Sequence, residues 1–151
     1  MAEGKRLFLA LWPDQSLQET LYSLARRLQK TQGGRRTRKE NIHLTLVFLG
    51  QVHADKEMEL RNRLRQVEAA PFELVIDKSG SFAQARVNWV GPSLQPRSLK
   101  GLYNAIRMIA QDVGYRGDNQ GFTPHITLLR KSSEAVVHDI RPLSWQVDSF
   151  Y

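Results

Sequence analysis

The chain has 151 residues, of which 41% are hydrophobic and 25% are charged, and it carries a net charge of +7 without any cysteine. This length suits one domain with a buried core, and the lack of cysteine excludes disulfides, a thiol nucleophile and thiolate ligands for zinc. No apolar run is long enough to span a bilayer, and the apolar run near the N-terminus lacks a signal-peptide cleavage site. We therefore expect a cytoplasmic protein that does not contact the membrane.

Hydrophobic periodicity in the first half of the chain predicts alternating strands and helices. An apolar strand is interrupted by Pro13 and Asp14, which mark the start of a helix, and leucines at helical spacing continue this helix towards Gly33 and Gly34. The expected elements are a strand over 5–11, a helix over 14–30, a strand over 43–49, a helix over 55–68 and a strand over 72–82 that bends near Gly80.

The second half repeats this plan. Leu21-Tyr22 and Leu102-Tyr103 lie in corresponding helices at an offset of 81 residues, which predicts two related strand–helix–strand units. Because the last strand stops at Tyr151 without a turn signal, we expect the natural chain to continue. The expected elements are a strand over 86–90, a helix with its apolar face from Leu99 to Val113, a glycine-rich loop over 114–121, and strands over 125–129 and 143–151.

Two copies of one strand motif, His43-Leu-Thr-Leu46 and His125-Ile-Thr-Leu128, lie 82 residues apart in a chain that has only four histidines. Successive side chains of a strand point to opposite faces. Each copy therefore presents an imidazole and a hydroxyl on one face, with two aliphatic residues behind them.

If the two strands are neighbours, their histidines can divide acid–base work, with one removing a proton and the other supplying one. The hydroxyls of Thr45 and Thr127 can hydrogen-bond phosphate oxygens, and Arg130 can bind phosphate through two N–H groups. This chemistry needs neither a metal nor a cofactor. The near symmetry of the two copies leaves open which histidine is the acid.

Other interpretations of these residues exist. One His-x-Thr in a strand is most often structural, but two copies in similar surroundings favour catalysis. Zinc is disfavoured because two histidines without a paired carboxylate form an incomplete site. His53 and His138 are expected at the surface. Five large aromatic residues are expected in the core: Trp12, Trp89, Trp145, Phe48 and Phe122. Phe48 and Phe122 are the candidates for another role, because each lies within five residues of a motif histidine.

A basic segment precedes the first motif. Between residues 26 and 39 there are seven basic side chains and no acidic one: Arg26, Arg27, Lys30, Arg35, Arg36, Arg38 and Lys39. Such a segment beside a candidate site indicates an anionic substrate such as nucleic acid. The alternatives are a solvated loop that aids solubility, or a non-catalytic RNA-binding module that uses this loop.

The paired motifs resemble the two HxTx motifs of the 2H phosphoesterase superfamily, and within it the LigT-like bacterial RNA 2′,3′-cyclic phosphodiesterases, also called 2′-5′ RNA ligases. The resemblance extends from Arg6 to Tyr151 and includes the segments 6–11, 43–50 and 123–130. Relatives usually continue past the position of Tyr151. The resemblance implies an α+β fold in which residues 1–151 form one two-lobed domain, truncated at the C-terminus, with pseudo-symmetric strand–helix–strand lobes around a central cleft.

The resemblance also implies an activity: metal-independent hydrolysis of 2′,3′-cyclic phosphates at RNA ends to 2′-phosphates, with 2′-5′ ligation as the reverse reaction. In this scheme His43 is the proton donor, His125 is the proton acceptor, and Thr45, Thr127 and Arg130 hold the phosphate. The implied protein is a monomer that acts on RNA ends, tRNA fragments included. A related cyclic phosphodiesterase that acts on a small nucleotide is the alternative within enzymes.

Overall fold

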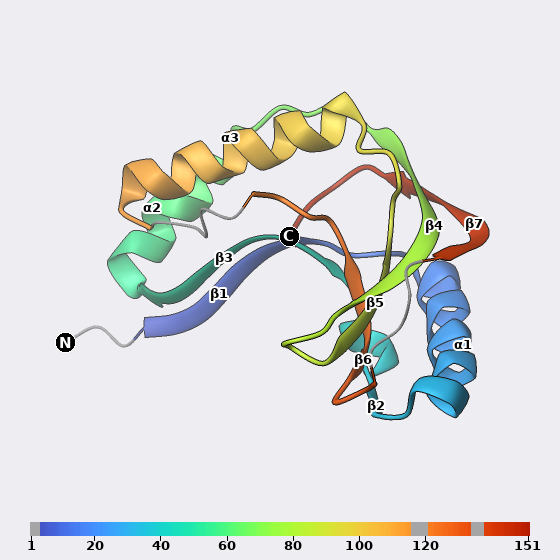
Figure 1. Cartoon of the computed structure of the whole chain (residues 1–151). Coiled ribbons are helices and arrows are strands. Elements are labelled where there is room, and N and C mark those ends of the chain that lie inside the picture. Colours follow the sequence, from blue (N-terminus) through green and yellow to red (C-terminus); the bar gives the residue numbers. More distant parts are fainter. Residues whose placement is uncertain (1–3, 116–120, 134–137) are drawn as a thin grey trace.

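The computed structural model describes residues 4–115, 121–133 and 138–151 (Figure 1). It confirms the α+β class. The strands are β1 (Gly4–Leu11), β2 (Arg35–Arg36), β3 (Leu44–His53), β4 (Phe72–Phe82), β5 (Val87–Gly91), β6 (Ile126–Arg130) and β7 (His138–Val147). The helices are α1 (Gln15–Gln32), the short 3₁₀ helix η1 (Lys39–Asn41), α2 (Ala54–Leu64) and α3 (Arg97–Val113).

The strands form one sheet in the order β1-β3-β6-β5-β4-β7, with β2 paired to β6, and every described pair is antiparallel. Within the described residues β3 and β6 are joined only by the pair Leu44 and Ile126. The sheet therefore divides into two halves at this point. We call β1, β3, α2 and α3 the first lobe, and β2, β4 to β7 and α1 the second lobe.

Each lobe is covered by a helix that follows a strand of the other lobe. Helix α1 follows β1 but packs on β2 and β6, and α3 follows β5 but packs on β3 (Figure 1). The two units β1-α1-β3 and β5-α3-β6 are thus built alike and interlock. This arrangement confirms the predicted repeat of two strand–helix–strand units, but each unit's helix packs on the other lobe, so the units and the lobes are different sets of elements.

The core lies between the sheet and these helices. Helix α3 has the strongly amphipathic pattern expected of a helix on a sheet, and its buried residues meet the apolar face of β3 and β6. The other face of these two strands carries the motif side chains. Fully buried residues include Leu11, Leu21, Leu44, Ile106, Ile126 and Leu128.

Most predicted boundaries agree with the structure to within a few residues. Asp14 caps α1 by accepting a hydrogen bond from the Leu17 amide at 2.8 Å, as its place before the helix predicts. Helix α2 ends at Leu64 rather than at 68, because the following turn tightens into bonds such as Val67 N–H to the Leu64 carbonyl. The strand predicted over 72–82 is continuous as β4.

The C-terminal strand differs more from its prediction. Strand β7 begins at His138 and ends at Val147, so the predicted range of 143–151 was wrong at both ends. Beyond β7 the chain crosses to the first lobe, where Tyr151 and Ala10 exchange backbone hydrogen bonds of 2.8 and 2.9 Å. Most of the predicted loop over 114–121 lies outside the described residues. None of the described helices combines the length and the apolar character that a membrane span requires.

Candidate active site

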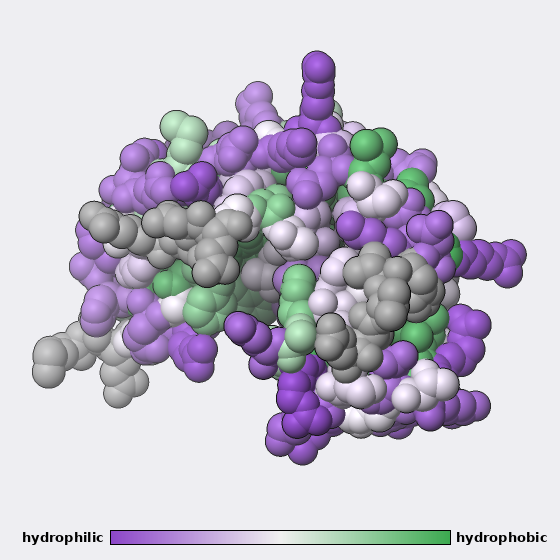
Figure 2. Space-filling model, in the orientation of Figure 1, coloured by the Kyte–Doolittle hydropathy of each residue, from purple (hydrophilic) through white to green (hydrophobic). Residues whose placement is uncertain are grey.

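The two motif histidines meet where the lobes join. His43 directly precedes β3, His125 directly precedes β6, and the residues after them, Leu44 and Ile126, are paired. In an antiparallel register this pair places each histidine across from the threonine of the other motif. Figure 2 shows the surface hollowed between the lobes. The structure therefore brings both predicted motifs to one place.

A β-bulge follows each threonine at the same position of the two motifs. In β3, Thr45 pairs with Ala10 and Val47 with Leu9, so Leu46 is left without a partner on β1. In β6, Thr127 pairs with Trp89 and Leu129 with Asn88, so Leu128 is likewise extra. As a result two consecutive aliphatic residues are buried in each strand: Leu46 with Val47, and Leu128 with Leu129.

The bulges decide which side chains reach the site. Strict alternation from His125 would put Arg130 on the face of the sheet opposite to the histidine. The extra residue, Leu128, shifts the alternation by one, so Arg130 lies on the same face as His125. Arg130 is exposed, and its positive charge acts on His43. Phe48 occupies the corresponding place in the first motif, and its side chain is 52% exposed. Phe48 therefore lies at the surface rather than in the core.

The same backbone contact orients both imidazole rings. Nδ1 of His43 lies 2.6 Å from the carbonyl of Asn41, and Nδ1 of His125 lies 2.8 Å from the carbonyl of Thr123. A carbonyl only accepts, so Nδ1 carries the hydrogen in each ring, and Nε2 remains as the atom that can take up or release a second proton. Nε2 of His43 lies 3.1 Å from the hydroxyl of Thr45.

The aromatic surroundings of the two histidines differ. Trp12 stacks on His43 with ring centroids 4.8 Å apart and an interplanar angle of 12°, and Phe8 lies 5.0 Å away. His125 instead meets the edge of Phe82 at 4.9 Å. The prediction that Trp12 belongs to the core was wrong, because half-buried Trp12 forms one wall of the site.

Gly91 is the counterpart of Trp12 in the second lobe. Leu11 pairs with Leu44 and Val90 pairs with Ile126, and Trp12 and Gly91 are the residues that follow Leu11 and Val90. A Cβ atom on Gly91 would lie 2.7 Å from the carbonyl oxygen of Pro124, so the backbone leaves no space for a side chain there. The stacked indole of His43 thus has no counterpart at the position of Gly91, and the indole beside His125, that of Trp89, lies 6.3 Å away at 62°.

Burial lowers the pKa of His43 below its usual 6.5. The hydrogen bond to the Asn41 carbonyl opposes this effect, and the positive charges of Arg130 and His125 lower the pKa further. A neighbouring positive charge disfavours the charged form of an imidazole.

An NMR titration should find the pKa of His43 below 6.5, with the imidazolium lost as the pH rises through that lower value. Arg130→Ala is expected to raise this pKa, because it removes a positive charge that disfavours the imidazolium. Lys131→Ala is the matched control and should leave the pKa of His43 unchanged. An unchanged His43 titration in Arg130→Ala would show that Arg130 does not face the ring.

Comparison with known proteins identifies the family. The model of the LigT-like phosphoesterases matches residues 11–89. The chain is 36% identical over 145 residues to the RNA 2′,3′-cyclic phosphodiesterase of Escherichia coli, covering 96% of this chain and 82% of that protein. The chain belongs to the LigT-like phosphoesterase family.

Two further relatives agree with this placement. The RNA 2′,3′-cyclic phosphodiesterase of Archaeoglobus fulgidus is 32% identical, covering 89% of this chain and 78% of that protein. The crystal structure of E. coli LigT in complex with 3′-AMP superposes with a TM-score of 0.88 at 36% identity, covering 98% of this chain and 86% of that one.

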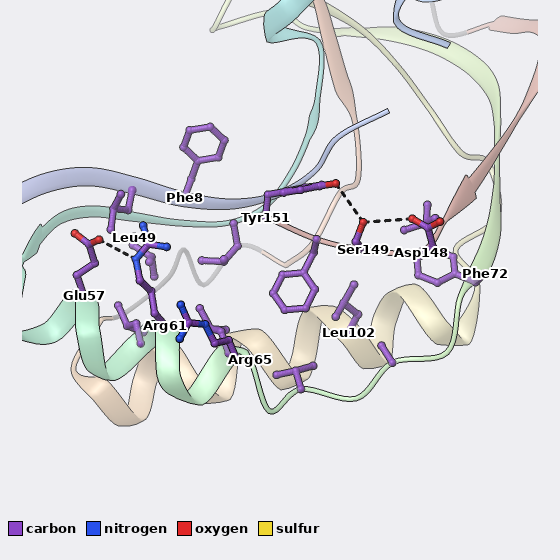
Figure 3. Close-up of a pocket in the computed structure, with 18 of the residues that line it drawn as sticks. Phe8, Leu49, Glu57, Arg61, Arg65, Phe72, Leu102, Asp148, Ser149 and Tyr151 are labelled. Atoms are coloured by element: carbon purple, nitrogen blue, oxygen red, sulfur yellow. Dashed lines mark hydrogen bonds and ion pairs between the residues drawn. The ribbon is translucent and has the colours of Figure 1, made fainter. Parts of the chain in front are cut away.

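This LigT-like phosphoesterase also has an open cavity of about 480 Å³, lined by residues of β1, α2, α3 and the C-terminal segment (Figure 3). Of its lining residues, Phe8 also contacts His43. Its walls are mostly apolar, with the Arg61–Glu57 ion pair at 2.8 Å on one side. No histidine lines it.

The structure also places most of the other residues that the sequence singled out. Thr45 and Thr127 are half-buried on the same strands, and His53 is exposed at the start of α2, as predicted. The side chain of His138 lies outside the described residues. In the described part of the chain no group of three or more His, Asp or Glu side chains could hold a metal ion.

The sequence did not predict that Trp12 and Phe8 contact His43. Phe48 was expected in the core, with another role as the alternative, and its side chain is exposed. One signal was available for the bulges. The consecutive aliphatic pairs Leu46-Val47 and Leu128-Leu129 break the alternation of each strand at the same distance from the histidine. A shared break of this kind predicts a bulge and a change of face for the residues that follow.

Proposed function

We propose that this chain is a hydrolase that opens the 2′,3′-cyclic phosphate at RNA ends and leaves a 2′-phosphate. The observation that carries the proposal is the meeting of two equivalent His-x-Thr motifs on adjacent strands, with Nδ1 of each ring fixed by a backbone carbonyl. The names of the E. coli and A. fulgidus relatives support the substrate.

The reaction needs two proton transfers. In our proposal His125 takes a proton from water as the water oxygen attacks phosphorus. The bond from phosphorus to O3′ then breaks, and His43 donates a proton to that oxygen. Thr45, Thr127 and Arg130 donate hydrogen bonds to the non-bridging oxygens, where negative charge grows. Ligation follows the same sequence with a 5′-hydroxyl in place of water: its oxygen bonds to phosphorus as His125 takes the proton, the bond from phosphorus to O3′ breaks, His43 protonates O3′, and a 2′-5′ linkage remains.

The difference between Trp12 and Gly91 supports this assignment of roles. Trp12 stacks on one face of His43, with Phe8 also in contact, whereas the aromatic neighbours of His125, Phe82 and Trp89, meet its ring in T-shaped contacts. The attacking water must reach the base from solvent, so the base has to be accessible. The leaving oxygen is part of the bound substrate, so the acid that protonates it does not need access to solvent. In our proposal the bound anionic phosphate favours the protonated form of His43, which is the form that a general acid requires.

The surroundings of the motifs support a nucleotide ligand. Phe48 offers an exposed aromatic ring on the site face, and the Arg6 guanidinium lies over that ring at 5.6 Å. Exposed aromatic rings stack on nucleobases. The site is complete within one chain, which supports action as a monomer. We place this monomer in the cytoplasm, with RNA ends such as tRNA fragments as its substrates.

The direct test is incubation with a short RNA that ends in a 2′,3′-cyclic phosphate, in the presence of EDTA. Mass spectrometry should show the gain of one water, and phosphorus NMR should place the phosphate on the 2′ oxygen. If the RNA binds but stays unchanged, the chain is a binding module rather than a hydrolase. Conversion of a mononucleotide alone would indicate the small-nucleotide alternative.

A further inference from the structure

The basic segment before the first motif comprises the end of α1, strand β2 and the start of η1, and β2 is paired with β6. Gly33 and Gly34 have φ values of +70° and +83°, which favour glycine. A Cβ atom on Gly34 would lie 2.4 Å from the carbonyl oxygen of Arg130 and 2.9 Å from the amide of Ser132. The chain at Gly34 therefore lies directly against the end of β6, and only glycine permits this approach.

Residues after Gly34 strengthen this contact. The Thr37 amide donates to the carbonyl of Leu128 at 2.9 Å, and the Thr37 hydroxyl donates to the carbonyl of Thr127 at 2.9 Å. The basic segment thus runs along the strand that carries the second motif. The part of the segment over residues 35–37 is therefore paired with β6 and is not a free loop.

The register of β2 on β6 places Arg35 opposite Arg130. Directly opposite residues of an antiparallel pair point to the same face, with Cβ atoms about 5 Å apart, and like charges in this position destabilise the sheet. Both side chains are exposed, and among the described residues neither forms a salt bridge. In Figure 2 the surface at this end of the sheet is strongly hydrophilic.

Two neighbouring cations of the same segment have partners. The Arg36 guanidinium lies over the ring of Tyr22 at 5.3 Å, and Lys39 pairs with Glu19 at 3.7 Å. What distinguishes Arg35 and Arg130 is that the strand register sets two positive groups directly opposite each other, with no salt bridge to either from the described residues. An anionic ligand that spans both would offset their repulsion.

We infer that Arg35 binds the internucleotide phosphate next to the terminal nucleotide of the RNA, while Arg130 holds the cyclic phosphate. The inference rests on the proposed function. A cyclic phosphate occupies the 3′ end of its strand, so the next phosphate lies on the 5′ side. Two adjacent guanidinium groups can bind two successive phosphates of one strand. A mononucleotide lacks the second phosphate, so Arg35 makes the enzyme select oligonucleotides.

The test compares Arg35→Gln with Arg65→Gln, which removes the same charge from an exposed position at the end of α2 in the other lobe. The substrates are a short RNA with a 2′,3′-cyclic phosphate and adenosine 2′,3′-cyclic monophosphate. We expect Arg35→Gln to lower kcat/KM for the RNA about tenfold, as for loss of one hydrogen bond between charged groups, and to leave the mononucleotide rate unchanged. Arg65→Gln should change neither rate.

An equal loss on both substrates, or no loss on the RNA, would overturn the inference. A second measurement distinguishes failure of this inference from failure of the proposed function: binding of the same RNA, measured by fluorescence anisotropy at several salt concentrations. If the wild type hydrolyses neither substrate, the proposed function fails. Weaker RNA binding by Arg35→Gln alone, with a salt slope smaller by about one, would still support the phosphate site. Unchanged binding would overturn it.

Discussion

Alanine in place of either His43 or His125 is expected to lower turnover of an RNA 2′,3′-cyclic phosphate by about 10²- to 10⁴-fold, the usual contribution of a positioned acid or base. The expectation follows from the geometry. Each ring is held by a backbone carbonyl two residues earlier, at 2.6 and 2.8 Å, so neither histidine can substitute for the other. Single-turnover rates with excess enzyme measure the loss directly.

His53→Ala is the matched control, because His53 is an exposed histidine at the start of α2 and should leave the rate unchanged. Circular dichroism should show that all three variants stay folded. The double variant should be little slower than the single ones, because the two histidines act as a unit. A folded His43→Ala or His125→Ala variant with a near wild-type rate would refute the two-histidine mechanism.

Arg130→Ala is the second change with a large expected effect, a fall in kcat of about 10²- to 10³-fold, comparable to loss of one donor to a developing oxyanion. The β-bulge at Leu128 turns Arg130 to the face of the histidines, where its charge acts on His43. Steady-state kinetics should show the loss mainly in kcat. Arg130→Lys should recover only part of it, because an ammonium group lacks the two-pronged geometry of guanidinium.

Lys131→Ala removes an exposed charge from the next position and should leave kcat within the error of measurement. If Arg130→Ala raised KM and left kcat unchanged, Arg130 would serve binding alone and not the transition state. That result would leave the roles of the histidines intact.

Much of the fold follows from local patterns. The leucine spacing of α1 and the apolar face of α3 predict these helices because helix periodicity is a property of neighbouring residues. Asp14 marks the start of α1 for the same reason. The C-terminal region was predicted less well. Nothing in the alternation of residues 143–151 shows that the chain leaves β7 after Val147 and pairs with Ala10 of β1.

The sequence by itself determined the chemistry of the site and its repetition. Two His-x-Thr motifs, each backed by aliphatic residues, are visible without coordinates, and they define which groups can move protons and bind phosphate. It also determined that the basic segment stands just before the first motif. These features depend on residue type and spacing alone.

Only the tertiary structure decided how these residues meet. The pair Leu44 and Ile126 joins the motifs, the bulges at Leu46 and Leu128 turn Phe48 and Arg130 to the site, and Gly34 lets β2 lie against β6. The physical reason is that strand register is set by side chains far apart in the sequence. A shift of one residue in that register moves every following side chain to the other face.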